Sequence, residues 1–412
     1  MAKKKVFLHI LGARPNFIKA APVFHAMEKK NIRNEILHTG QHYDYDMSEQ
    51  FFKEFSLPKP IYNLNIGSMT HGAQTGRMIE GIEKVLEKSH FDYIIIYGDT
   101  NSTLAGGLAS IKLGFPVAHI EAGVRTGNPE SPEEINRKLC DHIATINFSA
   151  TKLSYENLKS EGLSQSRNIF CGDVMYDMVL STKSIKPKII LPKKYVLATI
   201  HRQENTDNVE LLNKIFLNLI KLSETINVLI PIHPRTKNKL KAINLYDKVA
   251  NNLNIIEPQS YNNLLYLIKS SEIVISDSGG IPKEAAFLGV PSICIGNKII
   301  WYELYEQNWS FLLTTDKINN LLETYNLFKN IKVRKKLKGF GNGKASEKIA
   351  KLLSKNYKVA ILSRGYGRMS SGFNYVNLDS HPTIVGDEPL EIKINNPYCI
   401  VAVNNNRNKQ TQ

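Results

Sequence analysis

The chain has 412 residues, more than one hydrophobic core usually supports, which predicts two compact domains and some additional length. Hydrophobic residues make up 42% of it and charged residues 22%, a balance typical of globular proteins rather than disordered or membrane-embedded ones. No segment approaches the roughly 18 consecutive apolar residues of a membrane span. The net charge of +15 at pH 7 is spread along the whole chain, so we attribute it to a lysine-rich surface and expect no nucleic-acid or membrane partner.

Four cysteines lie far apart in the sequence and form neither a CxxC pair nor a metal-ligand spacing: Cys140, Cys171, Cys294 and Cys399. Reduced thiols in the cytoplasm are the simplest account of this pattern. We therefore expect a cytoplasmic protein without a metal site.

The first half of the chain alternates strand-like apolar runs with helical patterns, which predicts βαβ units and a parallel sheet. The predicted strands are 6–12, 35–40, 91–99, 116–123 and 146–150. The predicted helices end near Met27 and Leu113 or cover 132–146 and 152–162.

A second α/β series follows a looser stretch. Its predicted strands are 195–201, 227–234, 254–260, 272–280 and 291–296, with helices from Asn208 to Glu224 and over Asn262 to Ser270. The fold class is thus α/β, with two Rossmann-like doubly wound domains that face a cleft and a C-terminal appendage. We place the first domain at 1–174, a linker at 175–188, the second domain at 189–355 and the appendage at 356–412. The appendage shows one good strand, 357–363, and an Asn-rich end, 404–412, that we expect to be disordered.

Two cations and three carboxylates mark the predicted strand ends of the first domain. Arg14 and Lys19 lie at the start of a predicted helix, where two cations and the helix N-terminus suit an anion site. The pattern is equally consistent with two surface cations on a helix that has Pro15 in its first turn. Asp99 and Glu133 can serve as ordinary helix-terminus residues. Glu121 follows the apolar run PVAHI, so it should be partly buried, need a partner and have a raised pKa suited to acid–base chemistry.

The second domain carries histidines at two strand ends, His201 and His233. Single histidines are more often structural than catalytic, but two in equivalent positions favour a site. The stretch SDSGGIPKEAAFLG suits backbone binding of a diphosphate, with Glu284 one turn later reaching a ribose diol. It is also an ordinary strand-to-helix turn.

Two familiar nucleotide motifs are missing from the sequence. No GxGxxG follows the first strand, so nicotinamide chemistry is not expected, and GFGNGKAS at 339–346 has neither the spacing nor the Ser or Thr of a P-loop. We therefore expect no cofactor.

In this order, GARPNFIKAAPV, TGQHYD, GDTNSTLAGGLAS, PVAHIEAGVRTGN, PEEINR, GDVMYD, TIHRQEN, PIHP and SDSGGIPKEAAFLGVP resemble the non-hydrolysing UDP-N-acetylglucosamine 2-epimerases over residues 5–353. The resemblance implies a two-domain fold like that of GT-B glycosyltransferases, with UDP bound mainly by the second domain and the last helices crossing back to the first. It implies a UDP-amino sugar as substrate and a homodimer. The matching positions are Asp99, Glu121, Glu133 and His201 as catalytic residues, and Arg14, Lys19, His233, Ser278, Gly279, Gly280 and Glu284 as substrate-binding residues.

The implied reaction is also chemically reasonable. The C2 proton of an amino sugar is not next to a carbonyl, so UDP must leave C1 as that proton departs and then add back. This interconverts UDP-N-acetylglucosamine and UDP-N-acetylmannosamine, and it requires cations for the diphosphate and carboxylates of unequal pKa.

Departures from the family pattern concern the substrate and the tail. Asn16 stands where many members have Glu, and it resembles the branch that acts on UDP-2,3-diacetamido-2,3-dideoxyglucuronic acid, so both substrates stay open. Residues 356–412 resemble a fragment of the lipid A kinase, tetraacyldisaccharide 4′-kinase, without its P-loop. Two other classes also remain: a GT-B glycosyltransferase using a UDP-amino sugar and a sugar-nucleotide-binding protein.

Overall fold

The computed structural model describes residues 5–41, 45–331, 337–354, 360–363, 374–377, 380–390 and 400–403. The chain divides into two compact units, Met1–Leu352 and Leu353–Gln412. Within the described residues, none of the helices has the length and apolar character needed to cross a bilayer.

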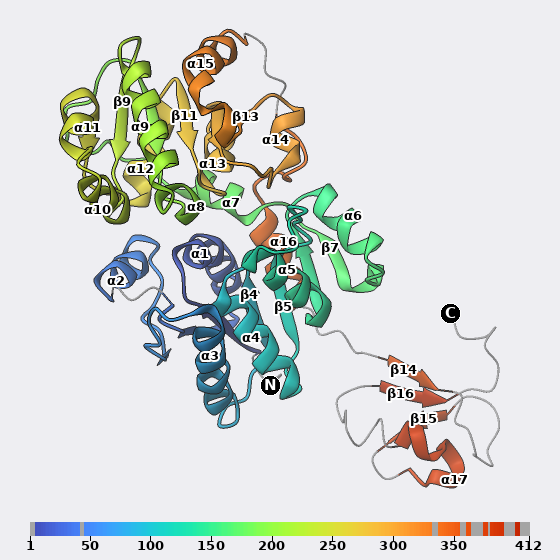
Figure 1. Cartoon of the computed structure of the whole chain (residues 1–412). Coiled ribbons are helices and arrows are strands. Elements are labelled where there is room, and N and C mark those ends of the chain that lie inside the picture. The colour runs from blue at the N-terminus through green and yellow to red at the C-terminus, as the bar shows by residue number, and fades with distance from the viewer. Residues whose placement is uncertain are drawn as a thin grey trace. The chain divides into compact units, whose positions relative to one another are not determined.

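The first unit begins with a seven-stranded parallel sheet in the order β3-β2-β1-β4-β5-β6-β7 (Figure 1). Its central strands are buried apolar runs, as parallel strands covered by helices on both faces should be. The strands are β1 (Val6–Leu11), β2 (Arg33–His38), β3 (Tyr62–Asn63), β4 (Tyr93–Tyr97), β5 (Val117–Ala122), β6 (Ile146–Ser149) and β7 (Asn168–Phe170). The helices are α1 (Arg14–Glu28), α2 (Tyr45–Glu54), α3 (His71–Leu86), α4 (Asn101–Lys112), α5 (Pro132–Ile143), α6 (Lys152–Ser160) and α7 (Val174–Ser181), with a 3-10 turn at Gln165–Arg167.

A six-stranded parallel sheet follows, in the order β10-β9-β8-β11-β12-β13. The strands are β8 (Tyr195–Thr199), β9 (Asn227–Pro231), β10 (Asn254–Ile256), β11 (Ile273–Ser276), β12 (Ser292–Ile295) and β13 (Ser310–Leu313). The helices are α8 (Gln203–Thr206), α9 (Val209–Ser223), α10 (Pro234–Ala242), α11 (Tyr246–Asn252), α12 (Tyr261–Ser270), α13 (Ile281–Phe287), α14 (Tyr302–Glu306), α15 (Leu321–Lys329) and α16 (Ala345–Ser354), with a 3-10 turn at Thr315–Asn320.

The two strand orders confirm the predicted pair of doubly wound α/β sheets. In both sheets the strand order reverses next to the first strand, between β1 and β4 and between β8 and β11. Right-handed crossovers then place helices on opposite faces of the sheet on either side of this reversal. The crevice that opens there, at the carboxyl ends of the strands, is where such folds bind their ligands.

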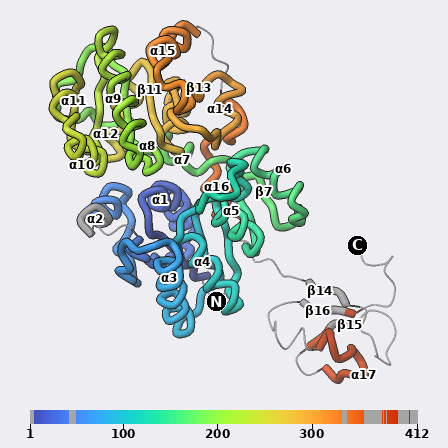
Figure 2. The backbone as a smooth tube through the Cα atoms, viewed as in Figure 1, coloured from blue at the N-terminus to red at the C-terminus, as the bar shows by residue number. Residues whose placement is uncertain are grey.

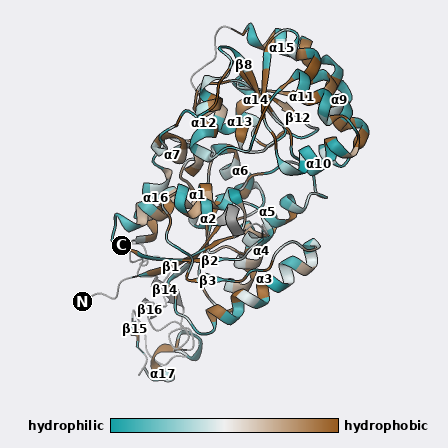
Figure 3. Ribbon diagram, turned by 90° about the vertical axis from the view of Figure 1, so that its left-hand side faces the viewer, coloured by the Kyte–Doolittle hydropathy of each residue, from teal (hydrophilic) through white to brown (hydrophobic). Residues whose placement is uncertain are grey.

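Helix α9 illustrates how the sequence produces these layers. Its apolar residues recur every three or four positions and pack on the second sheet, and the Asn208 side chain caps its first turn by accepting from the Leu211 amide. Burying each such side chain contributes roughly 1.5–3 kcal/mol. The apolar strands at the centre of both sheets are brown in Figure 3. The buried face of α9 consists of Leu212, Ile215, Phe216, Leu219 and Leu222.

The last helix of the first unit, α16, returns to the first sheet (Figure 2). Asp177 on α7 accepts hydrogen bonds from the backbone amides of Ala345 and Ser346, at 3.1 and 2.7 Å, and thereby caps α16. The Lys348 ammonium donates to the carbonyl of Phe170 at the end of β7. Helix α7 itself occupies the first half of the segment predicted as a linker, 175–188.

The second unit contains more strand than the sequence predicted. Strand β14 (Ala360–Ser363) pairs with β16 (Ile400–Val403), which also pairs with β15 (Asn374–Val376). Helix α17 (Pro382–Val385) adds Val385 to a small core with Val376 and Val403. The expectation of a single strand was wrong because β15 and β16 are too short to stand out in the sequence. The end predicted to be disordered, 404–412, lies outside the described residues.

Candidate functional site

The predicted site residues of the first sheet surround its strand-order reversal. Arg14 opens α1 directly after β1, and Asp99 follows β4 through the turn at Gly98. Glu121 lies near the end of β5, the next strand along. The sheet therefore brings together side chains that are about a hundred positions apart in the sequence, such as Lys19 and Glu121.

Glu121 is held between two lysines. The Lys19 ammonium donates to Oε1 at 2.5 Å, and the Lys283 ammonium donates to Oε2 at 3.0 Å. Burial by itself would raise the pKa of this carboxyl group, but the two ammonium groups lower it to about 2. The predicted burial and partner are confirmed, whereas the predicted raised pKa is wrong, because both carboxylate oxygens have a cation against them.

Lys283 and its second partner were not among the predicted site residues. The ammonium of Lys283 also donates to Oδ2 of Asp173 at 2.6 Å and lies 3.7 Å from the ring centroid of Trp301. Only 1% of the Lys283 side chain is exposed. Lys283 and Asp173 lie in two of the stretches that carry the family resemblance, SDSGGIPKEAAFLG and GDVMYD. The sequence signal that could have identified them as site residues is a charged side chain next to apolar ones.

The close approach of Lys19 to this cluster depends on Gly98. A methyl group at that position would lie 2.5 Å from the Lys19 nitrogen, and the backbone φ of +66° is one that other residues rarely adopt. Glu121 also has a positive φ, +70°, which is a strained conformation for glutamate. The positive φ values at Gly98 and Glu121 allow Lys19 and Glu121 to meet. Strained backbone of this kind is typical of functional sites.

Asp99 has a different environment from Glu121. Its carboxylate accepts a hydrogen bond from Arg137 on α5, and 21% of its side chain is exposed. Arg137 also donates to Glu134 at 3.0 Å. The neighbouring Glu133 is exposed and bonds to the Ser131 hydroxyl. The structure thus places Asp99 beside the site through Arg137, and it places Glu133 outside the buried ion-pair network.

A buried histidine supports the turn that carries Asp99. The ring of His119 joins Oδ1 of Asp141 to the carbonyl oxygen of Gly98, with both distances 2.8 Å. Asp141 also accepts from Arg125 at 2.7 Å. These three side chains hold the β4 and β5 ends at a fixed separation.

The second sheet carries the other half of the predicted site. Asp277, at the end of β11, accepts from the backbone amides of His201 and Arg202 and from the Asn205 amide, at 2.8–3.1 Å. This fixes the turn after β8 and brings the His201 ring within 5.9 Å of the His233 ring. Burial lowers the pKa of His201, and the nearby Asp277 carboxylate opposes this shift.

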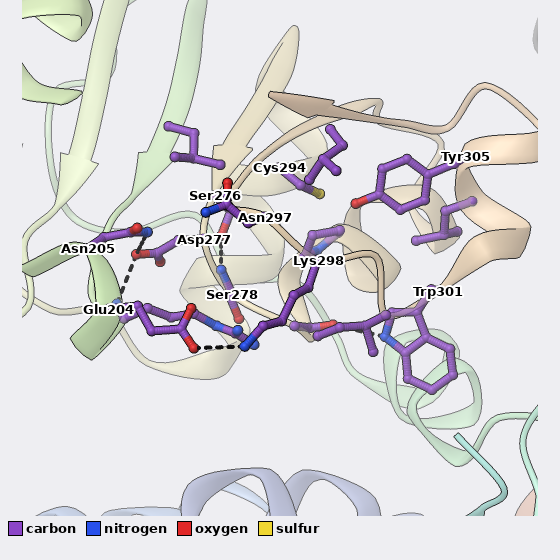
Figure 4. A pocket seen from close by; sticks show the side chains of 18 residues that line it. Glu204, Asn205, Ser276, Asp277, Ser278, Cys294, Asn297, Lys298, Trp301 and Tyr305 are labelled. Carbon is purple, nitrogen blue, oxygen red and sulfur yellow. Dashed lines mark hydrogen bonds and ion pairs between the residues drawn. The ribbon is translucent and has the colours of Figure 1, made fainter. Parts of the chain in front are cut away.

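A pocket opens at the strand-order reversal of this sheet (Figure 4). The Trp301 indole borders this pocket and donates a hydrogen bond to the Gly279 carbonyl at 3.0 Å. The predicted residues Ser278 and Gly279 line the pocket, while Gly280 follows them and donates to the Ser278 hydroxyl. The other lining residues are Arg202, Glu204, Asn205, Ser276, Asp277, Pro282, Cys294, Ile295, Gly296, Asn297, Lys298, Ile300, Leu304, Tyr305 and Leu312.

Glu284 lies close enough to Arg14 for the two charges to interact. It is buried on α13, and burial raises its pKa, while Arg14 of the first sheet lowers it. Arg14 is also close enough to influence His201 electrostatically. His233 instead caps α10, where its ring nitrogen accepts from the Arg235 amide at 3.2 Å. Of the predicted residues, Arg14, Lys19, Glu121, His201 and Glu284 therefore belong to one charged region, with Asp99 at its margin.

Comparisons with known proteins match most of the chain. A family model for UDP-N-acetylglucosamine 2-epimerase matches residues 25–354, and one for tetraacyldisaccharide-1-P 4′-kinase matches residues 339–412. A UDP-N-acetylglucosamine 2-epimerase homolog of Methanococcus maripaludis is 43% identical, over 84% of this chain and 98% of the relative. The UDP-2,3-diacetamido-2,3-dideoxy-D-glucuronate 2-epimerase of Pseudomonas aeruginosa is 40% identical, over 84% and 99%.

Among solved structures, that of the Methanocaldococcus jannaschii UDP-GlcNAc 2-epimerase, in complex with UDP-GlcNAc and UDP, superposes with a TM-score of 0.79 at 40% identity. The superposition covers 85% of this chain and 99% of that one. The family model spans most of the chain, and the relatives are matched almost from end to end. This chain belongs to the UDP-N-acetylglucosamine 2-epimerase family.

Proposed function

We propose that this protein inverts C2 of an N-acetylamino sugar carried on UDP. The substrate pair is UDP-N-acetylglucosamine and UDP-N-acetylmannosamine, or the corresponding UDP-2,3-diacetamido uronic acids. The observation that supports this most directly is the buried Glu121 between Lys19 and Lys283, since it combines an acid–base carboxylate with cations suited to a diphosphate. The pocket of the second sheet is the proposed uridine side.

The reaction proceeds by elimination and re-addition. A carboxylate takes the C2 proton, the C2–H electron pair forms a C1=C2 double bond, and the C1–O bond breaks with its electrons on the diphosphate. UDP then adds back to C1 while a proton reaches C2 from the other face. Proton donors and acceptors of unequal pKa and fixed cations at the departing diphosphate lower both barriers.

The proposed roles are those that the family resemblance implies. Asp99, Glu121 and Glu133 serve proton transfer, and His201 contacts the reacting region or the phosphates. Arg14 and Lys19 face the phosphates and the sugar. The UDP contacts are Ser278, Gly279, Gly280, His233 and Glu284.

The proposed division of labour follows the two sheets. We assign the sugar side and the acid–base carboxylates to 1–174, which contain β1 to β7, and UDP binding to 189–355, which contain β8 to β13. The intervening 175–188 connect them.

We also propose a cytoplasmic homodimer. Two apolar side chains one helical turn apart on α5, Ile135 and Leu139, are each 46% exposed and would be covered in a dimer. The three described cysteines are unpaired, which suits a reducing compartment. Analytical ultracentrifugation of the wild type and of Leu139→Asp tests the dimer.

The decisive experiment uses UDP-N-acetylglucosamine alone in heavy water, followed by NMR. We expect a second epimer to accumulate with deuterium at C2. An epimer that keeps its original C2 hydrogen would rule out elimination. A glycosyltransferase would need an acceptor, and a binding protein would show no turnover. A panel including the diacetamido uronic acid substrate then separates the two substrate classes.

A further inference from the structure

We propose that Lys283 is a positioning residue for Glu121, through which the nucleotide-binding half of the protein controls the orientation and charge of this carboxylate. The inference deepens the proposed function and rests on it. Its basis is one buried ammonium group that bonds to two carboxylates from the other half of the chain, Glu121 and Asp173.

The location of Lys283 is the first part of the argument. It lies on α13, between the pocket residue Gly279 and the buried Glu284. Its hydrogen bond to Glu121 spans 162 positions in the sequence and joins the second sheet to the end of β5. A displacement of α13 by a bound nucleotide is therefore transmitted to Glu121 without any intermediate residue.

The energetic argument concerns packing. Burying an ammonium group is unfavourable unless partners compensate, so a residue that only filled space would be apolar. Here the charges alternate along a chain of hydrogen bonds from Lys19 through Glu121 and Lys283 to Asp173. Two cations and two anions balance, which explains how four ionised groups share a buried site.

Trp301 provides a second link to the nucleotide side. Its ring lies 3.7 Å from the Lys283 ammonium, and its indole nitrogen donates to the carbonyl of Gly279. The same ring borders the pocket. A ligand in the pocket thus touches residues that fix Lys283 from two sides, the α13 turn and the indole.

The electrostatic consequence follows from the groups that face Glu121. Lys19 comes from α1 and Lys283 from α13, while Arg137 on α5 interacts at longer range and is itself paired with Asp99. Asp173 acts on Glu121 through Lys283. Removing the Lys283 charge leaves Glu121 hydrogen-bonded to Lys19, so we expect the pKa of Glu121 to rise above its wild-type value.

The first test is the pH dependence of kcat/KM for three variants. In Lys283→Met we expect kcat to fall by about 10² with a smaller change in KM, and the acidic limb to move to higher pH by about one unit or more. Lys283→Arg should return the acidic limb to its wild-type pH, since this variant keeps a cation beside Glu121. Asp173→Asn should keep the limb at the wild-type position, because Glu121 retains both ammonium groups. An unshifted limb in Lys283→Met would overturn the proposal.

A second test does not require turnover. The double variant Lys283→Met with Asp173→Asn removes one charge of each sign and so avoids a net buried charge. We expect the pH dependence of its urea midpoint between about pH 4 and 8 to differ from that of the wild type, and the difference to vanish when both proteins carry Glu121→Gln. Persistence of the difference without Glu121, or no difference at all, contradicts the link. A positive result in a protein that does not epimerise would refute the proposed function alone.

Discussion

The side-chain amide of Asn16 donates to the main-chain carbonyl of Tyr97 at 2.8 Å, while its oxygen accepts from the Ala13 amide at 2.9 Å. One buried side chain therefore ties the turn after β1 to the end of β4. A glutamate at this position, as in many relatives of the resembled family, could not donate to the carbonyl. The ends that carry Arg14 and Asp99 are thus held together by a bond that requires an amide.

The Asn16→Asp variant tests this bond. It replaces the donor with an acceptor that faces a carbonyl in a buried site, so we expect a loss of about 1–3 kcal/mol in the free energy of unfolding. Urea unfolding measures it. The exposed Asn252→Asp, whose side chain bonds within its own helix, is the control and should change stability little. Equal stability of both variants would contradict the role given to Asn16.

Substitutions of the catalytic carboxylates should lower kcat, whereas substitutions of the nucleotide contacts should weaken UDP binding. Removing a general acid or base lowers turnover by about 10² to 10⁴ without abolishing ground-state binding. We expect Asp99→Asn and Glu121→Gln to lose kcat but still bind UDP, as measured by titration of the tryptophan fluorescence. Full turnover in both variants would show that other residues carry out the proton transfer.

The opposite pattern is expected on the nucleotide side. Ser278→Ala and Glu284→Ala remove a pocket hydroxyl and a buried carboxylate, so they should weaken UDP binding itself. Arg14→Ala should do the same, because it removes a cation from the phosphate side. Calorimetric titration with UDP measures all three. Wild-type affinity in all three variants would place the nucleotide away from these residues.

Neighbouring glutamates on α5 form a matched pair. Glu133 is exposed, whereas Glu134 is buried and accepts from Thr126 and Arg137 at 3.0 Å. We expect Glu133→Gln to lower kcat at unchanged Tm, as its proposed catalytic role requires, and Glu134→Gln to lower Tm. An unchanged kcat in Glu133→Gln would remove this residue from the mechanism.

Glu134 should also contribute to acid sensitivity. Burial opposes its ionisation, but the bonds from Thr126 and Arg137 lower the pKa of Glu134 below its ordinary value of 4.5. A carboxyl group whose pKa is lower in the folded state contributes stability that is present above about pH 4.5 and is lost as pH falls through the folded value. The Tm of the wild type should therefore fall more steeply below pH 4.5 than that of Glu134→Gln. Parallel curves would contradict this assignment.

The second unit should be dispensable for epimerisation. A chain that ends at Lys355 keeps α16 and its cap by Asp177, so we expect it to fold, bind UDP and turn over like the full chain. A chain that ends at Lys344 removes α16 and should be destabilised. Phosphorylation of a lipid A disaccharide from ATP should be undetectable with the full chain. A folded but inactive chain ending at Lys355 would show that the tail completes the site.

The sequence by itself determined the alternation of strands and helices, and hence two parallel α/β sheets, because period and composition are local properties. It also determined that Arg14, Asp99 and His201 lie at strand ends, where open α/β sheets bind ligands. The short strands β15 and β16 were not predicted because runs of three or four residues do not establish a period.

Only the tertiary structure decided the electrostatics of Glu121. Burial and ion pairing shift its pKa in opposite directions, and the sequence reveals burial through the apolar run PVAHI but not the partners. Lys283 and Asp173 are 162 and 52 positions from Glu121, so their contact depends on how the two sheets pack. The same holds for the neighbours Glu133 and Glu134, since the rotation of α5 about its axis selects which one is buried.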